Sequence, residues 1–215
     1  EFRDQECLFV YGRGNQMGFG PPVTPSIIKN LIIANGVVFI AQYLSNGLVS
    51  KWAVVSPDLV WFKFELWRPF TYMWLHSVNS PFHILFNMLV LWMFGVQLER
   101  LWGLPFFVRY YFITGTGAGV ATIVAGLLPF AFSEPTYLAV TIGASGAIYG
   151  LLVAFAIYYP NTPILMFFLF PVPAKYFVMI IGAITFLSVP RSAGVAHIAH
   201  LGGLVVGYVY LKYGG

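Results

Sequence analysis

The sequence predicts an all-α polytopic membrane protein with six transmembrane helices. Of its 215 residues, 59% are hydrophobic and only 8% are charged, whereas a soluble domain carries about 25% charged residues. The apolar residues form long runs, and a transmembrane helix needs about 20 predominantly apolar residues. We therefore expect one membrane domain at residues 27–215. The net charge of +4 is small and gives no reason to expect nucleic acid as a partner.

Residues 1–26 are expected to form a flexible N-terminal tail. They mix acidic and basic side chains with many glycines and prolines. They do not resemble a signal peptide, because no basic segment precedes an apolar run. The single cysteine, Cys7, lies in this tail, so the sequence predicts neither a disulfide framework nor a cysteine metal site.

Six apolar segments are candidate spans, at residues 27–44, 82–98, 105–128, 145–160, 176–187 and 193–211. Residues 45–75 mix charged and aromatic side chains, which favours a position in the membrane interface. Residues 164–173 contain Pro171 and Pro173, so we interpret them as a connector. One kinked span over residues 164–187 is the alternative, and the topology is the same in both cases.

The basic residues favour a cytoplasmic N-terminus, because cytoplasmic loops carry more Lys and Arg. With six spans, seven of the eleven Lys and Arg fall on the inner side, and the other four fall on the outer side: Lys51, Lys63, Arg68 and Arg191.

The second, fourth and sixth spans run in the same direction, so their N-terminal ends lie at the same, outer face. Polar residues stand at or near all three ends: His76, His83, Asn87, Ser145, His197 and His200. All four histidines of the chain therefore converge on one leaflet. Polar groups in hydrocarbon are costly without compensation, so the convergence indicates hydrolytic chemistry inside the bilayer.

Ser145 is the candidate nucleophile. Gly143 and Gly146 frame it, and a helix N-terminus offers free N–H groups to a developing oxyanion. A serine hydroxyl needs a general base, and we expect His197 in that role. We interpret His200, one turn later, as structural. Taken singly, such a serine is also compatible with helix packing, and such a histidine with a structural hydrogen bond.

His83 and Asn87 are four residues apart, so they share one face of their helix. Their N–H groups are candidate oxyanion donors, and interhelical hydrogen bonding is the alternative. Tyr149, one turn after Ser145, is expected to pack on the ring of His197. No carboxylate is placed to complete a triad, which favours a Ser–His dyad.

A histidine cluster also suggests zinc. However, no carboxylate lies within the cluster and no His-Glu-x-x-His motif is present. We therefore expect no metal, and we assign no role to His76 or Asn79.

Together these motifs resemble the rhomboid intramembrane serine proteases over about residues 27–212. The matching pieces, in order, are Trp67-Arg68, His83-Ile84-Leu85-Phe86-Asn87, Glu99-Arg100 with Gly103, Gly143-Ala144-Ser145-Gly146 with Tyr149, and Ala196-His197 followed by Gly202, Gly203 and Gly207. One departure concerns the start of the second helix. Many members have a histidine five positions before the equivalent of His83, where this chain has Val78, and His76 lies seven positions before.

The resemblance implies a six-helix fold in which Ser145 attacks the scissile carbonyl and His197 transfers the proton. His83, Asn87 and the Ser145 N–H group would hold the oxyanion. No cofactor is implied.

The resemblance also implies that Trp67 and Arg68 anchor the first loop in the outer leaflet and that residues 188–196 cap the site. The implied substrates are single-span membrane proteins, cut near the outer end of their helix, with membrane lipid as the other partner. A multi-pass protein of a bacterial inner membrane, with its site open to the outer side, fits this interpretation.

Two other functions compete with proteolysis. A rhomboid-like pseudoprotease would bind membrane-protein clients without cutting them, but such relatives usually lack the serine or the histidine. A transporter or channel predicts paired intramembrane charges or an inverted repeat, and the sequence offers neither.

Overall fold

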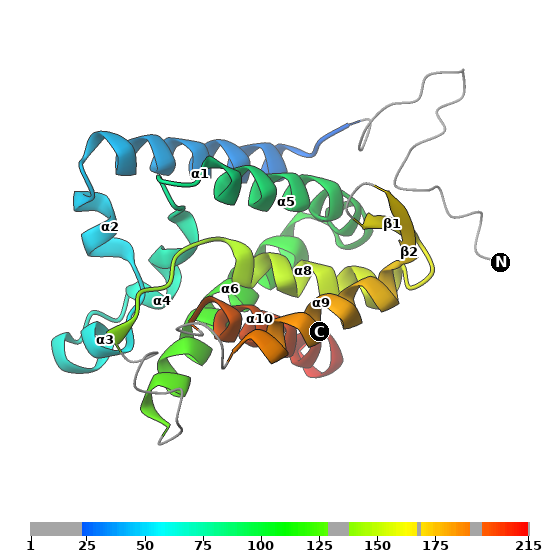
Figure 1. Cartoon of the computed structure of the whole chain (residues 1–215). Coiled ribbons are helices and arrows are strands. Elements are labelled where there is room, and N and C mark those ends of the chain that lie inside the picture. Colours follow the sequence, from blue (N-terminus) through cyan, green and yellow to red (C-terminus); the bar gives the residue numbers. More distant parts are fainter. Residues whose placement is uncertain (1–22, 129–137, 167–168, 190–194, 215) are drawn as a thin grey trace.

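The computed structural model describes residues 23–128, 138–166, 169–189 and 195–214, so the predicted tail lies almost entirely outside it. The described part consists mainly of helices (Figure 1): α1 (Ser26–Leu44), α2 (Leu48–Ala53), α3 (Pro57–Lys63), α4 (Arg68–Thr71), the 3-10 helix η1 (Tyr72–Trp74), α5 (Pro81–Trp102), α6 (Leu104–Leu127), α8 (Ser145–Tyr158), α9 (Ala174–Ser188) and α10 (Val195–Tyr213). The helices α1, α5, α6, α8, α9 and α10 fall on the six predicted segments.

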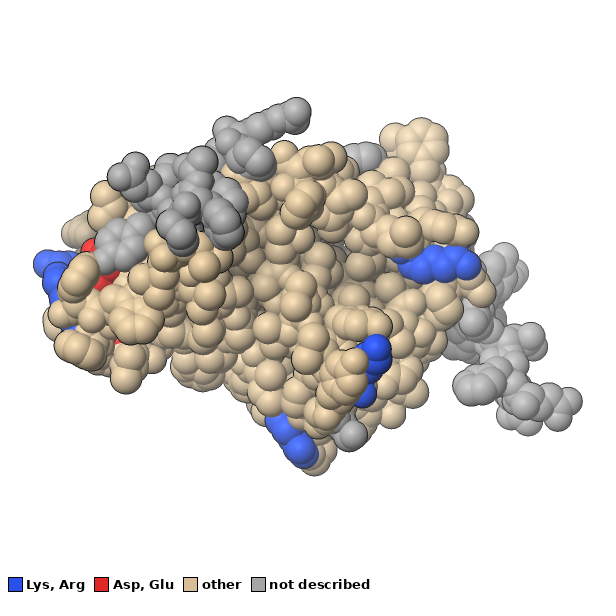
Figure 2. All heavy atoms as spheres, turned by 90° about the horizontal axis from the view of Figure 1, so that it is seen from below, with Lys and Arg blue, Asp and Glu red and all other residues tan. Residues whose placement is uncertain are grey.

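Three helices, α1, α5 and α6, are long and apolar enough to cross a membrane, and α8 and α9 are shorter apolar helices. The surface suits a membrane, because the face in Figure 2 is almost entirely uncharged, with Lys and Arg at a few places and Asp or Glu at its left edge only. These observations, made on the described residues, support an integral membrane protein. The count of six crossings remains a prediction.

Residues 163–173 differ from the simple connector that the sequence suggests. The strands β1 (Pro163–Met166) and β2 (Phe170–Pro173) pair antiparallel, with Pro163 opposite Pro173. The hairpin leads directly into α9, which excludes one kinked helical span over this region. The two prolines of β2 are tolerated because a two-stranded sheet has only edge strands.

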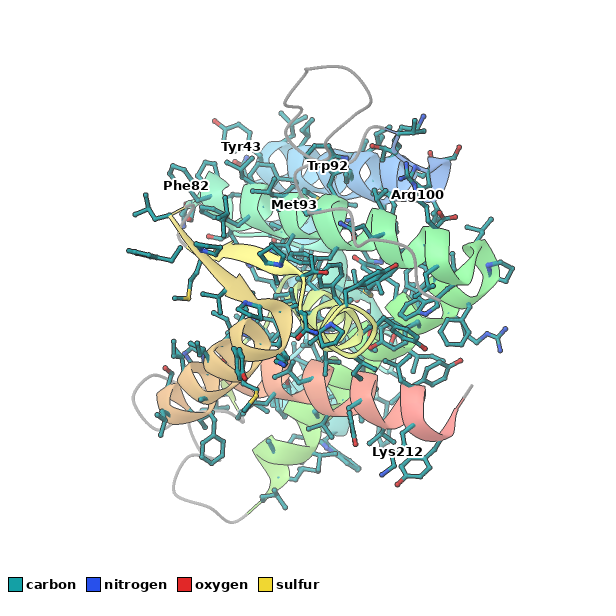
Figure 3. The ribbon with its side chains drawn as sticks, turned by 90° about the vertical axis from the view of Figure 1, so that its right-hand side faces the viewer. Tyr43, Phe82, Trp92, Met93, Arg100 and Lys212 are labelled. Carbon is teal, nitrogen blue, oxygen red and sulfur yellow. The ribbon has the colours of Figure 1, made fainter. Side chains whose placement is uncertain are left out.

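The helices α5, α8 and α10 run in the same direction, as the topology predicts. In Figure 1 all three begin beside the small helices α2, α3 and α4. In Figure 3, Arg100 and Lys212, near the ends of α5 and α10, lie at one end of the bundle, whereas Phe82, in the first turn of α5, lies at the other. The starts of the three helices therefore meet at one end of the bundle.

The first loop, residues 45–80, is held by the two residues that the resemblance singled out. Arg68 is 2% exposed and donates to the carbonyl oxygens of Val54, at 2.6 Å, and Lys51, at 3.0 Å, and it forms an ion pair with Glu65. The indole N–H of Trp67 donates to the carbonyl oxygen of Trp52 at 3.1 Å. Both residues thus tie α4 to α2 and its C-terminal end. Their position in a leaflet stays a prediction.

The centre of the bundle is α8, which packs against α10 and α6 through small residues. A Cβ atom on Gly203 of α10 would overlap the carbonyl oxygen of Gly146, and one on Gly146 would lie 2.5 Å from the Cβ atom of Ala118 in α6. Small residues allow helix backbones to approach closely in membranes, where van der Waals packing drives association. The glycines therefore set the distance and the register between α8 and α10.

We expect Gly203→Ala to separate α8 from α10 and to lower the free energy of unfolding by about 3 kcal/mol or more, because overpacking against a backbone atom cannot be relieved by a rotamer change. Gly36→Ala is the matched control, since a Cβ atom there meets nothing within 4 Å. Thermal unfolding in detergent measures both. Equal stability of the two variants would contradict the assigned role of the Gly146–Gly203 contact.

Candidate active site

Ser145 is the first residue of α8, and the segment before it is fixed to the first loop. Thr141 and Val55 exchange backbone hydrogen bonds of 2.8 and 3.2 Å, and the N–H group of Gly143 donates to the carbonyl oxygen of Tyr72 at 3.0 Å. Gly143 has φ +120°, which side chains disfavour, and a Cβ atom there would lie 3.0 Å from Nε2 of His83. The turn before Ser145 therefore requires glycine.

The histidine that meets Ser145 is His200. Its Nε2 atom lies 2.7 Å from Oγ of Ser145. From the sequence we expected His197 at this place. In the part of the chain that the structure describes, His197 makes no hydrogen bond to Ser145. The ring centre of His197 lies 6.2 Å from that of His200. The sequence-based prediction that His197 lies beside Ser145 is therefore wrong in the structure, where His200 is the histidine within hydrogen-bond distance of Ser145.

The register between α8 and α10 explains this correction. Gly203 contacts Gly146, the residue directly after Ser145. The residue one turn before Gly203 is His200, and it is brought level with Ser145, whereas His197 lies one turn further toward the start of α10. The sequence did contain a signal for this pairing. Ser145 lies directly before Gly146, and His200 lies one turn before Gly203. Close packing of the two helices requires both glycines.

Tyr149 packs on the histidine ring as expected, but the ring is that of His200. The two ring centres are 4.2 Å apart and the planes differ by 6°. Nδ1 of His200 is buried and has no hydrogen-bond partner among the described residues. The ring is therefore oriented by stacking, where a triad would use a carboxylate.

His83 presents an N–H group to the site. Its Nδ1 atom accepts a hydrogen bond of 3.2 Å from the backbone N–H of Ser77. A neutral imidazole whose Nδ1 accepts carries its proton on Nε2. This Nε2–H group is the one beside Gly143, so the backbone of the first loop selects the tautomer whose N–H group lies at the turn before Ser145.

Asn87 lies one turn after His83 on the same helix face, and its side chain is 8% exposed. In this structure its amide nitrogen donates to the carbonyl oxygen of His83 at 2.6 Å. The shared face agrees with the sequence analysis. An oxyanion contact would require the amide to turn away from this backbone bond.

His76, which had no role in the sequence analysis, packs against the site. Its backbone exchanges hydrogen bonds with the side chain of Gln42 in α1, and its ring centre lies 5.1 Å from that of His83. The ring is fully buried, and neither ring nitrogen has a hydrogen-bond partner among the described residues. His76 thus supports His83 from the first loop despite the departure at Val78.

Among the described residues no group of three or more His, Cys, Asp and Glu side chains is close enough to hold a metal ion. The predicted cap at residues 188–196 falls largely outside the described residues.

Burial, with the nearby His83 ring as a second cause, lowers the pKa of His76 to about 4. Between that pKa and the ordinary value of about 6.5, the unfolded chain binds a proton that the folded chain excludes. The stabilisation is therefore complete above about pH 6.5 and is lost as the pH falls, by up to about 3 kcal/mol near pH 4. We expect His76→Phe to reduce this pH dependence in unfolding experiments, and Asn79→Gln, at an exposed position of the same loop, to leave it unchanged. The same pH dependence in His76→Phe as in wild type would contradict the buried, neutral state of His76.

Comparisons with known proteins agree with this architecture. The chain matches the family model of the Rhomboid domain over residues 63–214. It is 29% identical over 169 residues to RHOMBOID-like protein 1 of Arabidopsis thaliana, an alignment that covers 77% of this chain and 39% of that protein.

Two bacterial relatives are named as proteases. The chain is 30% identical over 154 residues to rhomboid protease AarA of Providencia stuartii, covering 66% of this chain and 54% of that protein. It is 33% identical over 123 residues to rhomboid protease GlpG of Salmonella choleraesuis, covering 57% of this chain and 40% of that protein. The matched region is thus about two-fifths to one-half of these relatives' length. With a match to the family model over most of its length, the chain belongs to the rhomboid family.

Proposed function

We propose that the chain is an intramembrane serine endopeptidase in which Ser145 and His200 form the catalytic dyad. The observation that carries the proposal is the 2.7 Å distance between Oγ of Ser145 and Nε2 of His200 at the start of α8. A serine is a poor nucleophile unless a positioned base takes its proton, and this geometry is within the reach that such a transfer needs.

In the first step, Oγ of Ser145 attacks the scissile carbonyl carbon while Nε2 of His200 accepts the hydroxyl proton. The carbonyl oxygen becomes an oxyanion. Three donors are available to it: the backbone N–H of Ser145 at the positive end of α8, the Nε2–H group of His83, and the amide of Asn87 once it has turned from the backbone.

The protonated His200 then gives its proton to the leaving amine nitrogen, and an acyl-enzyme on Ser145 remains. Water attacks this ester with His200 again as base, and Ser145 is restored. Tyr149 presents its ring face to the imidazole, which favours the imidazolium form in both steps.

The substrates we propose are single-span membrane proteins, cut near the outer end of their helix. A helix hides its carbonyl groups in backbone hydrogen bonds, so local unwinding must precede attack. The names of the two bacterial relatives as rhomboid proteases support the reaction class. We also propose that the protein lies in a bacterial inner membrane with a cytoplasmic N-terminus and a site open to the outer side. Trp67 and Arg68 anchor the first loop in the outer leaflet.

Fluorophosphonate labelling of the purified protein in detergent tests the dyad directly. We expect labelling of the wild type, a loss of at least about 1,000-fold in Ser145→Ala and His200→Ala, and retention in His197→Ala, because only the first two variants remove the pair. Loss in His197→Ala with retention in His200→Ala would restore the assignment made from the sequence. A folded wild type that is not labelled would instead point to a pseudoprotease that binds clients.

Cleavage kinetics with a single-span substrate test the oxyanion donors. We expect Asn87→Ala to lower kcat by about 10- to 1,000-fold, since one donor to the transition state is lost. Leu85→Ala, at an exposed position two residues before Asn87 on the same helix, is the control and should cleave at the wild-type rate. An unchanged kcat for Asn87→Ala would leave this residue with its helix-internal hydrogen bond only.

A further inference from the structure

The helix α9 contributes one polar side chain to the interior of the bundle. The residues of α9 are mostly exposed or half-buried, as expected for a lipid-facing helix, and only Ala174, Val178 and Thr185 are buried. Ala174 and Val178 lie in the first half of the helix. Thr185 is 3% exposed and lies near its C-terminal end. A hydroxyl group in such a position is costly unless a specific partner satisfies it.

The partner of Thr185 is Tyr149. The hydroxyl oxygens of the two side chains are 3.2 Å apart, so the bond joins α9 to α8. The ring of Tyr149 stacks on His200, which in turn meets Ser145. A continuous series of contacts therefore runs from α9 through α8 and α10 to the proposed nucleophile.

His200 needs such support because, among the described residues, no hydrogen bond to its second ring nitrogen orients the ring. Its Nδ1 atom has no hydrogen-bond partner there, whereas a carboxylate at that nitrogen fixes the ring in a Ser–His–Asp triad. The stacked ring of Tyr149 takes over this function. A stacked ring can still tilt, and the hydrogen bond at its far end restricts that tilt.

We propose that Thr185 is a positioning residue for the proposed Ser145–His200 dyad, acting through the hydroxyl group of Tyr149. This inference rests on the proposed function. It also couples the C-terminal half of α9 to the dyad, because a displacement of α9 breaks the bond to Tyr149 and frees the ring on which His200 lies.

The test uses the intact protein and measures the rate of fluorophosphonate labelling together with kcat and KM for a single-span substrate. Thr185→Val removes the hydroxyl group at nearly constant shape. We expect the labelling rate and kcat to fall by about 3- to 10-fold, the range that one net hydrogen bond supports, with KM unchanged. Thr185→Ser keeps the hydroxyl group and should restore the wild-type rates.

Two further variants complete the design. Tyr149→Phe keeps the ring and removes its hydroxyl group, so it should match Thr185→Val, and the double variant should lose no more than either single variant. Thr122→Val makes the same chemical change at a buried threonine whose hydroxyl group donates within α6, to the carbonyl oxygen of Ala118. We expect this control to label at the wild-type rate.

Three outcomes would overturn the inference while leaving the proposed dyad intact. They are wild-type rates in Thr185→Val, a loss of rate in Thr185→Ser as large as in Thr185→Val, and additive losses of rate in the double variant. A folded wild type that is neither labelled nor able to cleave would overturn the proposed function, and the inference with it. The two failures are therefore distinguishable.

Discussion

The geometry of the site follows from how closely the backbones of α8 and α10 approach each other. Gly146 and Gly203 carry no side chains, and the space for a Cβ atom on Gly203 is taken by a backbone carbonyl. In a membrane, where lipid is as apolar as the protein interior, close packing replaces the hydrophobic effect as the force between helices. The same contact that holds the bundle together thus fixes the register that brings His200 to Ser145.

The first loop is the second support of the site. Arg68 binds two carbonyl groups from α2 and its C-terminal end, and the backbone of this loop then pairs with the segment that leads into α8. Farther along, the N–H of Ser77 selects the tautomer of His83. Residues distant from Ser145 in sequence thereby determine where α8 begins and which nitrogen of His83 carries the proton.

Among the described residues no carboxylate forms a hydrogen bond or an ion pair with Ser145, His200 or His83. The orienting groups are backbone N–H groups, a helix terminus and an aromatic ring, all of which are neutral. Ionised side chains are costly at membrane depth, so a dyad held by stacking avoids the desolvation of a buried carboxylate. Stacking constrains the imidazole less than a carboxylate would, and the hydrogen bond between Tyr149 and Thr185 is the contact that we propose adds to this constraint.

The sequence alone predicts the membrane class and the positions of the main helices within a few residues. It also predicts the common direction of α5, α8 and α10 and the position of Ser145, His83 and Asn87 at one end of the bundle. These features depend on apolar runs and on parity, which are local or topological. The sequence alone does not predict the hairpin at residues 163–173, the contact of His76 with His83, or the contact of Thr185 with Tyr149. These features depend on contacts that the tertiary structure forms. The choice between His197 and His200 is of the same kind. The two residues are three apart on one helix, and the close packing of the α8 and α10 backbones at Gly146 and Gly203 determines which of them lies level with Ser145.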